Sequence, residues 1–89
     1  MILTATITVA SLMHTIAVRE GFYRRDSLPA RYHNPCALVY ARQLGAVPGA
    51  RGFAWFVGDA DGWMACERDL RKKIARGGNL SKAWEYLKP

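Results

Sequence analysis

Apolar residues recur at three- and four-residue spacing over the first twenty positions of the chain. Four of them form one stripe of a helix: Val9, Leu12, Met13 and Ile16. We expect this helix to run from about residue 4 to residue 20. The next position of the stripe is Glu20, and Gly21 suits the left-handed cap that ends a helix. The pattern therefore predicts a carboxylate in the last helical turn, in line with the buried face.

The middle of the chain combines an irregular segment with two short β-prone runs. Residues 22–35 show neither helical nor strand periodicity and contain two prolines, so we expect an ordered loop. Residues 38–41 and 52–57 are β-prone and are expected to pair as a hairpin, joined by a mobile connection at residues 42–51. In the second run one face carries Phe53, Trp55 and Val57, and the other carries Ala54 and Phe56.

The last third of the chain predicts two further helices. Asp59 is a suitable N-cap for a helix that should stop at Gly77 and Gly78. Its expected stripe is Trp63, Cys66 or Glu67, Leu70 and Ile74, and its basic outer face contains Arg68, Arg71 and Lys72. Asn79 can cap a short final helix, after which the chain ends at Pro89. The elements together indicate an α+β fold that is mostly α-helical.

The composition is that of one small folded domain with a basic surface. With 89 residues, 51% of them hydrophobic and 22% charged, the chain can form one core, and residues 1–89 are expected to be a single domain. Thirteen Lys and Arg against seven Asp and Glu leave a net charge of +6. This charge favours a polyanionic partner, such as nucleic acid, an anionic membrane or a bacterial cell wall.

The cysteines and the N-terminal stretch argue against a zinc-binding protein and against a membrane-spanning protein. Cys36 and Cys66 lie thirty positions apart without a CxxC motif or a Cys/His cluster, which argues against zinc or another cofactor. We predict two free thiols, because disulfides are rare in reducing compartments. Residues 1–18 carry no acidic or basic side chain except His14, but interspersed polar residues leave fewer than the roughly 20 apolar residues that cross a bilayer. We expect no transmembrane segment.

Glu20 is the residue whose setting indicates chemistry. Ionising a glutamate on an apolar stripe is costly, and the negative end of the helix dipole acts in the same direction, so we expect a raised pKa. A carboxylic acid that stays protonated near neutral pH suits glycosidic bond cleavage, because the leaving oxygen must receive a proton. The alternative is an exposed Glu20 that pairs with a local base such as Arg24.

The order of short motifs along the chain resembles small phage and prophage muramidase-like proteins. That family has an I-A-x-x-E-G-F/W segment followed by S-L-P-x-R-x-x-N-P-G-N, and later G-(F/Y)-A-x-F and G-W. The corresponding stretches here are residues 16–23, 27–31, 34–35, 52–56, 61–63 and 80–89. The resemblance extends over about residues 8–89 and also parallels flagellar-type glucosaminidases, in which a helix-terminal Glu precedes an asparagine-rich loop and a hairpin.

This resemblance implies a minimal lysozyme-like fold, with helices around a short β-hairpin and Glu20 as the catalytic acid of a peptidoglycan-cleaving endolysin. It also implies that Arg31 and Asn34 shape the groove or bind the glycan. Cys36 and Ala37 stand where the family has Gly and Asn, and Gly often supplies a backbone conformation that costs Cys energy. The loop after Asn34 is therefore expected to differ from that of the family.

A second carboxylate would decide the stereochemistry of cleavage. Asp26 is the candidate second acid because it follows Glu20 closely, and its alternative role is to pair with a neighbouring arginine. Asp59 and Asp61 fit helix capping better. Without a second acid, a lytic transglycosylase route with one Glu and the substrate's own hydroxyl stays open, so the sequence leaves hydrolysis and transglycosylation as alternatives.

Aromatic residues are the candidate stacking surfaces for sugar rings. The candidate stacking residues are Tyr23, Tyr32, Tyr40, Phe53 and Trp55. Of these, Tyr23, Tyr40 and Trp55 are the predicted substrate-binding residues. Because strand faces alternate, at most about half of the hairpin aromatics can line a groove. His14 has no partners at ligand spacing, so we expect an exposed or hydrogen-bonded histidine and no metal site.

Two other functions explain the charge without catalysis. The basic run at residues 68–76 favours a nucleic-acid-binding protein, but no helix-turn-helix, zinc-finger or RNP signature accompanies it. A non-catalytic virion or cell-wall-binding protein with a degenerate groove is the other alternative. For the enzyme, the expected partner is peptidoglycan and not nucleic acid, and a homodimer is reasonable for so small a core. The expected location is the host cytoplasm, with action in the periplasm or cell wall, or the virion.

Overall fold

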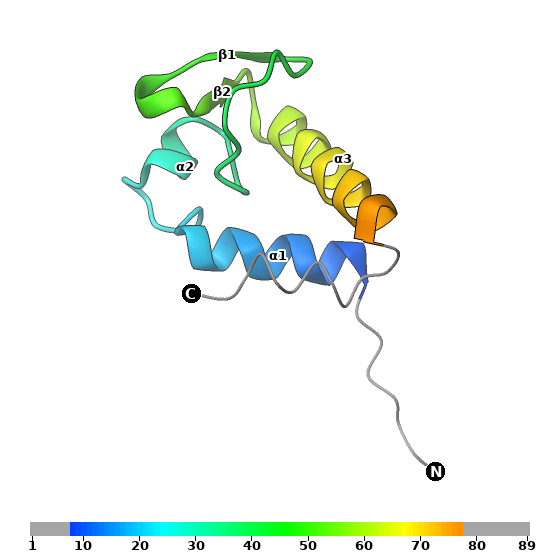
Figure 1. The fold of residues 1–89 in the computed structure, drawn as a ribbon. Helices are drawn as coiled ribbons and strands as arrows, with labels where there is room; N and C mark the ends of the chain where they lie inside the picture. The colour runs from blue at the N-terminus through cyan, green and yellow to red at the C-terminus, as the bar shows by residue number, and fades with distance from the viewer. Residues whose placement is uncertain (1–7, 78–89) are drawn as a thin grey trace.

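The computed structural model describes residues 8–77, which form an α+β fold that is mostly helical, as the sequence predicts. The elements are α1 (Val9–Glu20), α2 (Leu28–Arg31), β1 (Ala46–Pro48), β2 (Ala54–Phe56) and α3 (Asp59–Gly77). The strands form an antiparallel hairpin that packs against α3. In Figure 1, α2 lies above the C-terminal end of α1, and the hairpin lies farther from α1, beside the start of α3.

α1 begins later than its apolar pattern suggests and ends where predicted. The backbone N–H of Ser11 donates to the Thr8 hydroxyl at 3.0 Å, and that of Thr8 donates to the Ser11 hydroxyl at 3.1 Å. Thr8 is extended, so this capping box sets the helix start at Val9, and the expected start near residue 4 is wrong. Gly21, with φ 82°, forms the left-handed cap.

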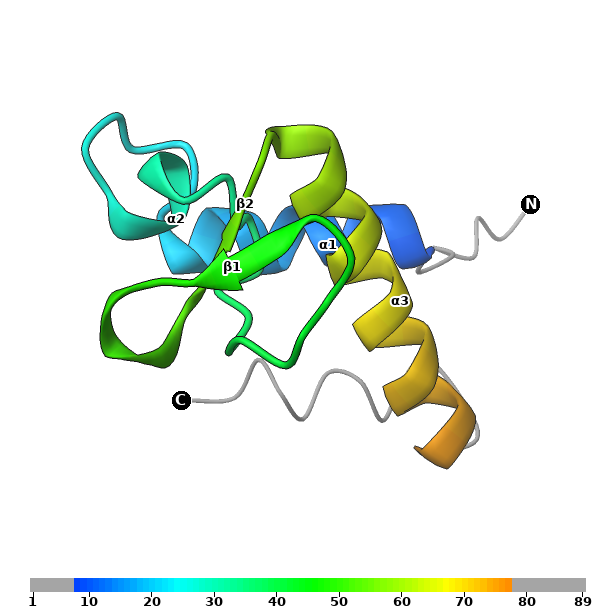
Figure 2. The same cartoon turned by 90° about the horizontal axis from the view of Figure 1, so that it is seen from above.

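In the turned view of Figure 2, α3 crosses α1, and the main core lies between these two helices. Its buried members are Leu12, Met13, Cys66 and Leu70, with Val9, Ile16, Trp63 and Ile74 packed around them. These residues are the two stripes predicted from helical spacing. A second cluster joins the hairpin to α3 through Ala54, Phe56 and Ala65. The predicted alternation along β2 is confirmed, because Ala54 and Phe56 are buried while Trp55 is exposed.

The hairpin uses a different first strand from the one predicted. β1 is Ala46–Pro48, within the expected mobile connection, and it pairs Val47 with Trp55 at the centre of the hairpin. The predicted strand at residues 38–41 makes only a single bridge, between Val39 and Phe53. Leu38 and Tyr40 instead pack their side chains against the hairpin cluster. Burial of these two side chains outweighs their β-propensity, which depends on context.

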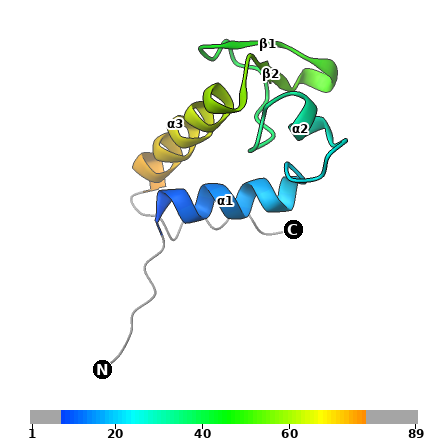
Figure 3. The ribbon, with the colours of Figure 1, turned by 180° about the vertical axis from the view of Figure 1, so that it is seen from behind.

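The predicted loop at residues 22–35 contains a short helix, α2. The Ser27 hydroxyl caps it by accepting a hydrogen bond from the Ala30 backbone at 3.2 Å. Pro29 lies in the first turn, where a helix needs no backbone donor, so its proline ring does not forbid the helix as the sequence suggested. Seen from behind in Figure 3, the chain leaves α1 and turns back through α2 towards the hairpin.

The prediction of two free thiols is wrong, because Cys36 and Cys66 form a disulfide with a Cα–Cα distance of 5.7 Å. The bond joins the loop after Asn34 to the buried face of α3. Sequence spacing carries no information about whether two Cα atoms come close enough to bridge. Since Cys66 belongs to the main core, the disulfide fixes the loop directly to that core.

The start of α3 is fixed by a contact with the loop that follows α2. Asp59 is the first helical residue and not the cap, and its carboxylate accepts a hydrogen bond from the His33 ring at 2.8 Å. Gly62 allows the helix to approach this loop, because a Cβ there would collide with the His33 carbonyl oxygen. The predicted final helix after Asn79 lies outside the described residues. Within residues 8–77, no helix is both long and apolar enough to cross a membrane.

In the loop after Asn34, the residue with the unusual backbone conformation is Ala37, whereas the sequence pointed to Cys36. Cys36 is not left-handed, whereas Ala37 has φ 52° and donates its backbone N–H to the Asn34 carbonyl at 3.1 Å. Asn, the residue of the resembling family at this position, enters the left-handed region more readily than Ala. The energetic penalty therefore falls on Ala37.

Replacing Ala37 with glycine is expected to stabilise the protein by about 0.5–1 kcal/mol. A left-handed conformation costs an L-residue roughly 1–2 kcal/mol, and the greater unfolded-state freedom of glycine offsets about 0.5–1 kcal/mol of the gain. Urea unfolding of Ala37→Gly measures the change. Ala41→Gly, at a nearby exposed alanine without positive φ, is the control and should destabilise. Equal destabilisation by both variants would contradict the conclusion that Ala37 is strained by its left-handed conformation.

Candidate functional site

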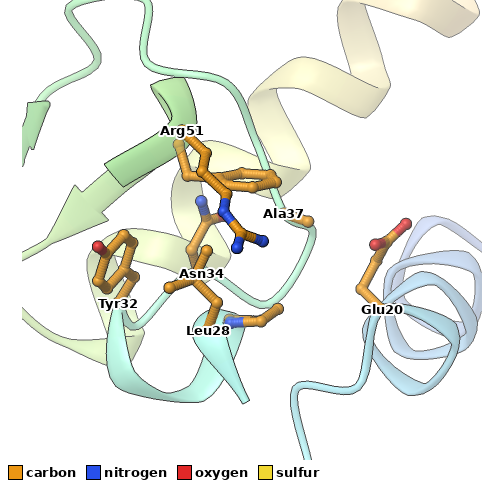
Figure 4. Close-up of a pocket in the computed structure, with 8 residues that line it drawn as sticks. Glu20, Leu28, Tyr32, Asn34, Ala37 and Arg51 are labelled. Carbon is orange, nitrogen blue, oxygen red and sulfur yellow. The ribbon is translucent and has the colours of Figure 1, made fainter. Parts of the chain in front are cut away.

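A cleft of about 200 Å³ lies between the end of α1 and the hairpin. Figure 4 shows Glu20 on one side of this cleft, with Arg51, Ala37 and Asn34 facing it from the other. The lining residues come from four segments of the chain and are Glu20, Leu28, Pro29, Tyr32, Asn34, Ala37, Arg51 and Phe53. The cleft thus places a single carboxylate opposite a guanidinium.

Glu20 is the last residue of α1, and it is exposed. The buried stripe of α1 ends at Ala17, because α3 crosses α1 nearer to Leu12 and Met13. The burial that the helical stripe predicted for Glu20 is therefore wrong. Glu20 makes no ion pair with Arg24 or with any other described base. Its carboxylate is thus accessible to a ligand in the cleft.

Asn34 forms the inner wall of the cleft and is 1% exposed. Its Nδ2 group donates to the carbonyls of Leu38 and Ala54, both at 2.9 Å. Its Oδ1 accepts from the Leu38 backbone N–H, also at 2.9 Å. These bonds join the loop to β2, so the predicted glycan-binding residue has its amide occupied by backbone. Asn34 shapes the groove by positioning the loop that carries Ala37.

Replacing Asn34 with alanine is expected to reduce the free energy of unfolding by about 1–3 kcal/mol, because buried backbone groups lose their partners. Urea unfolding gives this value. The matched control is Gln43→Ala, which removes an amide that also bridges backbone groups, those of Val39 and Ala41, but in an exposed loop. We expect less than about 1 kcal/mol for the control. A loss at position 34 no larger than that of the control would contradict the positioning role.

Arg51 lines the cleft but was not predicted as a site residue, whereas Tyr32, which also lines it, was a candidate stacking residue. The Tyr32 hydroxyl accepts a hydrogen bond from the Ala50 backbone at 3.0 Å, and its ring stacks on Trp55 at 4.7 Å between centroids. These contacts hold the tip of the hairpin, where Arg51 has φ 58°. A signal was present in the glycines that flank Arg51 at positions 49 and 52, since glycine clusters mark turns.

The other predicted substrate-binding residues lie outside the cleft. Trp55 is 46% exposed on the outer face of the hairpin, and Tyr40 packs on the cluster between hairpin and α3. Arg31 ends α2 with its side chain exposed. Tyr23 is hydrogen-bonded to His14 at 3.1 Å, which confirms the expectation of an exposed, hydrogen-bonded histidine. Of the predicted binders, the cleft brings only Asn34 together with Glu20.

Two carboxylates share surface hollows with Glu20. The predicted Asp26 borders an open groove together with Glu20, Arg24 and Arg25. Asp69 borders a hollow of about 170 Å³ that also contains Glu20 and the disulfide, and it pairs with Lys73 at 2.8 Å. Asp59 and Asp61 border neither of these hollows. Asp69 was missed because its sequence neighbours form a charged helical face typical of solvated surfaces.

The part of the chain that the structure describes holds no cluster of His, Cys, Asp and Glu able to bind a metal ion. Comparison of the chain with protein families, curated proteins and solved structures found no match.

Proposed function

We propose that this protein cleaves the glycan strands of peptidoglycan and that Glu20 protonates the glycosidic oxygen. The position of Glu20 carries this proposal, because its exposed carboxylate borders a cleft formed by α2, the Asn34 loop and the hairpin tip. A glycan that fills the cleft would bring a glycosidic oxygen towards this carboxyl, the one acidic group among the described residues that line the cleft. The likeness of the motif order to phage muramidase-like proteins supports the same assignment.

The chemistry needs a proton donor for the leaving oxygen, a nucleophile for the anomeric carbon and a base that takes the nucleophile's proton. The Glu20 carboxyl gives its proton to the glycosidic oxygen as the bond from that oxygen to the anomeric carbon breaks. In hydrolysis a water adds to the carbon and loses its proton to a carboxylate. The candidates for this base are Asp26 and Asp69, each of which borders a hollow that Glu20 also borders. In transglycosylation a hydroxyl of the same sugar adds instead, and the ionised Glu20 takes its proton.

The disulfide supports action outside a reducing cytoplasm. Disulfides persist in the periplasm and in extracellular settings, where peptidoglycan is also found. Since Cys36 lies two positions after Asn34, oxidation also fixes the cleft wall. We therefore propose that the protein acts in the periplasm or at the cell wall and is fully stable only after it reaches that compartment.

A non-catalytic cell-wall-binding protein is the second candidate. The observation that favours it is that Glu20 has no ion-pair partner among the described residues, so those residues leave its orientation unfixed. A binding protein with this cleft retains peptidoglycan affinity but releases no fragments. The release of peptidoglycan fragments therefore distinguishes the enzyme from the binding protein.

The test is the turbidity of outer-membrane-permeabilised Gram-negative cells mixed with the purified, oxidised protein. The proposed activity predicts falling turbidity together with release of soluble fragments from isolated sacculi, which contain no membrane. Falling turbidity without fragment release would indicate cationic membrane damage and would overturn the proposal. Sedimentation of the protein with sacculi, without fragment release, would favour the binding protein.

A further inference from the structure

A second hollow, of about 260 Å³, lies between the 38–44 loop and α3. We call it the cationic hollow, and its charged lining consists of Arg42 from the loop and of Arg68, Asp69 and Lys72 from α3. Leu38 and Leu44 add apolar surface to it. Positive charge thus faces this space from both walls.

The cations of this hollow differ from their neighbours on α3. Arg71 pairs with Glu67 at 3.0 Å, and Lys73 pairs with Asp69 at 2.8 Å. In contrast, Arg42, Arg68 and Lys72 form no ion pair with any described residue, and all three are exposed. Cations that converge on one space without carboxylate partners favour an anionic ligand, to which arginine donates charge-assisted hydrogen bonds.

The cationic hollow adjoins the proposed catalytic site. Leu38 and Asp69 border both this hollow and the one that contains Glu20 and the disulfide. Glu20 in turn borders the cleft opposite Arg51. A substrate bound in the cleft can therefore place a side branch along α3 and into the cationic hollow.

We infer that the cationic hollow binds the acidic peptide that branches from the glycan strand of peptidoglycan, an inference that rests on the proposed function. The peptide's carboxylates suit Arg42, Arg68 and Lys72, and its aliphatic parts suit Leu38 and Leu44. A nucleic-acid backbone fits less well, because apolar walls and the Asp69 carboxylate interrupt the row of cations that successive phosphates need. The substrate class is thus a glycan that carries acidic peptides.

Titration of the free tetrapeptide L-Ala-γ-D-Glu-diaminopimelate-D-Ala tests this inference by NMR or calorimetry. The variant R42Q/R68Q/K72Q should bind it roughly tenfold more weakly than the wild type, since each exposed charge contributes little alone. The control R19Q/R71Q/R76Q removes the same charge from outside the hollow and should retain affinity within about twofold. The same peptide with amidated carboxylates should bind the wild type about as weakly as the acid peptide binds the first variant.

Equal loss in both triple variants, or no binding of the peptide by the wild type, would overturn the inference. So would a first variant whose affinity falls for duplex DNA or anionic vesicles but not for the peptide. The titration does not depend on catalysis, so it separates the two proposals. Peptide binding without glycan cleavage would support the peptide site in the cationic hollow and contradict the proposed enzyme activity. Glycan cleavage without peptide binding would support the enzyme activity and contradict the peptide site.

Discussion

Glu20→Gln is expected to reduce fragment release from isolated sacculi at least about a hundredfold. The amide has nearly the shape of the carboxyl but cannot give up an acidic proton to the glycosidic oxygen. Because Glu20 is exposed and has no ion pair among the described residues, the free energy of unfolding should change by less than about 0.5 kcal/mol. Initial rates of dye release from labelled sacculi, measured beside urea unfolding curves, give both quantities.

The matched control is Glu67→Gln, which makes the same change of charge on the outer face of α3. Glu67 pairs with Arg71 at 3.0 Å and does not border any hollow that contains Glu20. This control should release fragments at close to the wild-type rate. If Glu20→Gln were as active as Glu67→Gln, Glu20 would not be the acid.

Loss of the Cys36–Cys66 disulfide is expected to lower the free energy of unfolding by about 3–4 kcal/mol. The sequence separation of 30 residues sets the loop entropy that the bond removes from the unfolded chain. A domain this small has little other stability to offset the loss. Activity should fall with it, because the bond holds the loop that carries Ala37 in the cleft wall.

Urea unfolding of the wild type with and without dithiothreitol measures this loss. The double variant Cys36→Ser/Cys66→Ser should unfold near the midpoint of the reduced wild type, and dithiothreitol should not change its midpoint further. An unchanged wild-type midpoint under verified reduction would show that the disulfide does not stabilise the fold.

The helical part of the fold was predictable because its physical signal is periodic. The stripes that include Leu12 and Leu70 were identified correctly, as was the glycine cap at Gly21. The helix start was not, because the capping box of Thr8 and Ser11 interrupts a stretch that looks uniformly helical. Capping depends on two short polar side chains, whose signal is weaker than a repeated apolar face.

The β-structure and the disulfide were less predictable because both depend on distant parts of the chain. The Ala46–Pro48 strand is three residues long, too short for alternation to mark it. The choice between it and residues 38–41 depends on which side chains the α3 surface buries. The bond between Cys36 and Cys66 likewise requires the loop and α3 to be in place first.

The candidate site was predictable in its acid and not in its surroundings. The helical pattern placed Glu20 at the end of α1. It could not show that α3 does not extend over the last turn of α1, so that Glu20 stays exposed. Asn34 was identified from a sequence motif as a glycan-binding candidate, but its side chain is hydrogen-bonded to the backbone of Leu38 and Ala54. Arg51 and Asp69 meet Glu20 only through tertiary folding, so no spacing in the sequence joins them to it.

Mass spectrometry of the fragments released from isolated sacculi tests the central claim most directly. The wild type should release disaccharide-peptide fragments, and Glu20→Gln should release none above background. Reducing ends would identify hydrolysis and anhydro ends would identify transglycosylation, and either outcome agrees with Glu20 as the acid. No fragments from the oxidised, folded wild type, or equal amounts from both proteins, would contradict the assignment of this cleft to glycan cleavage.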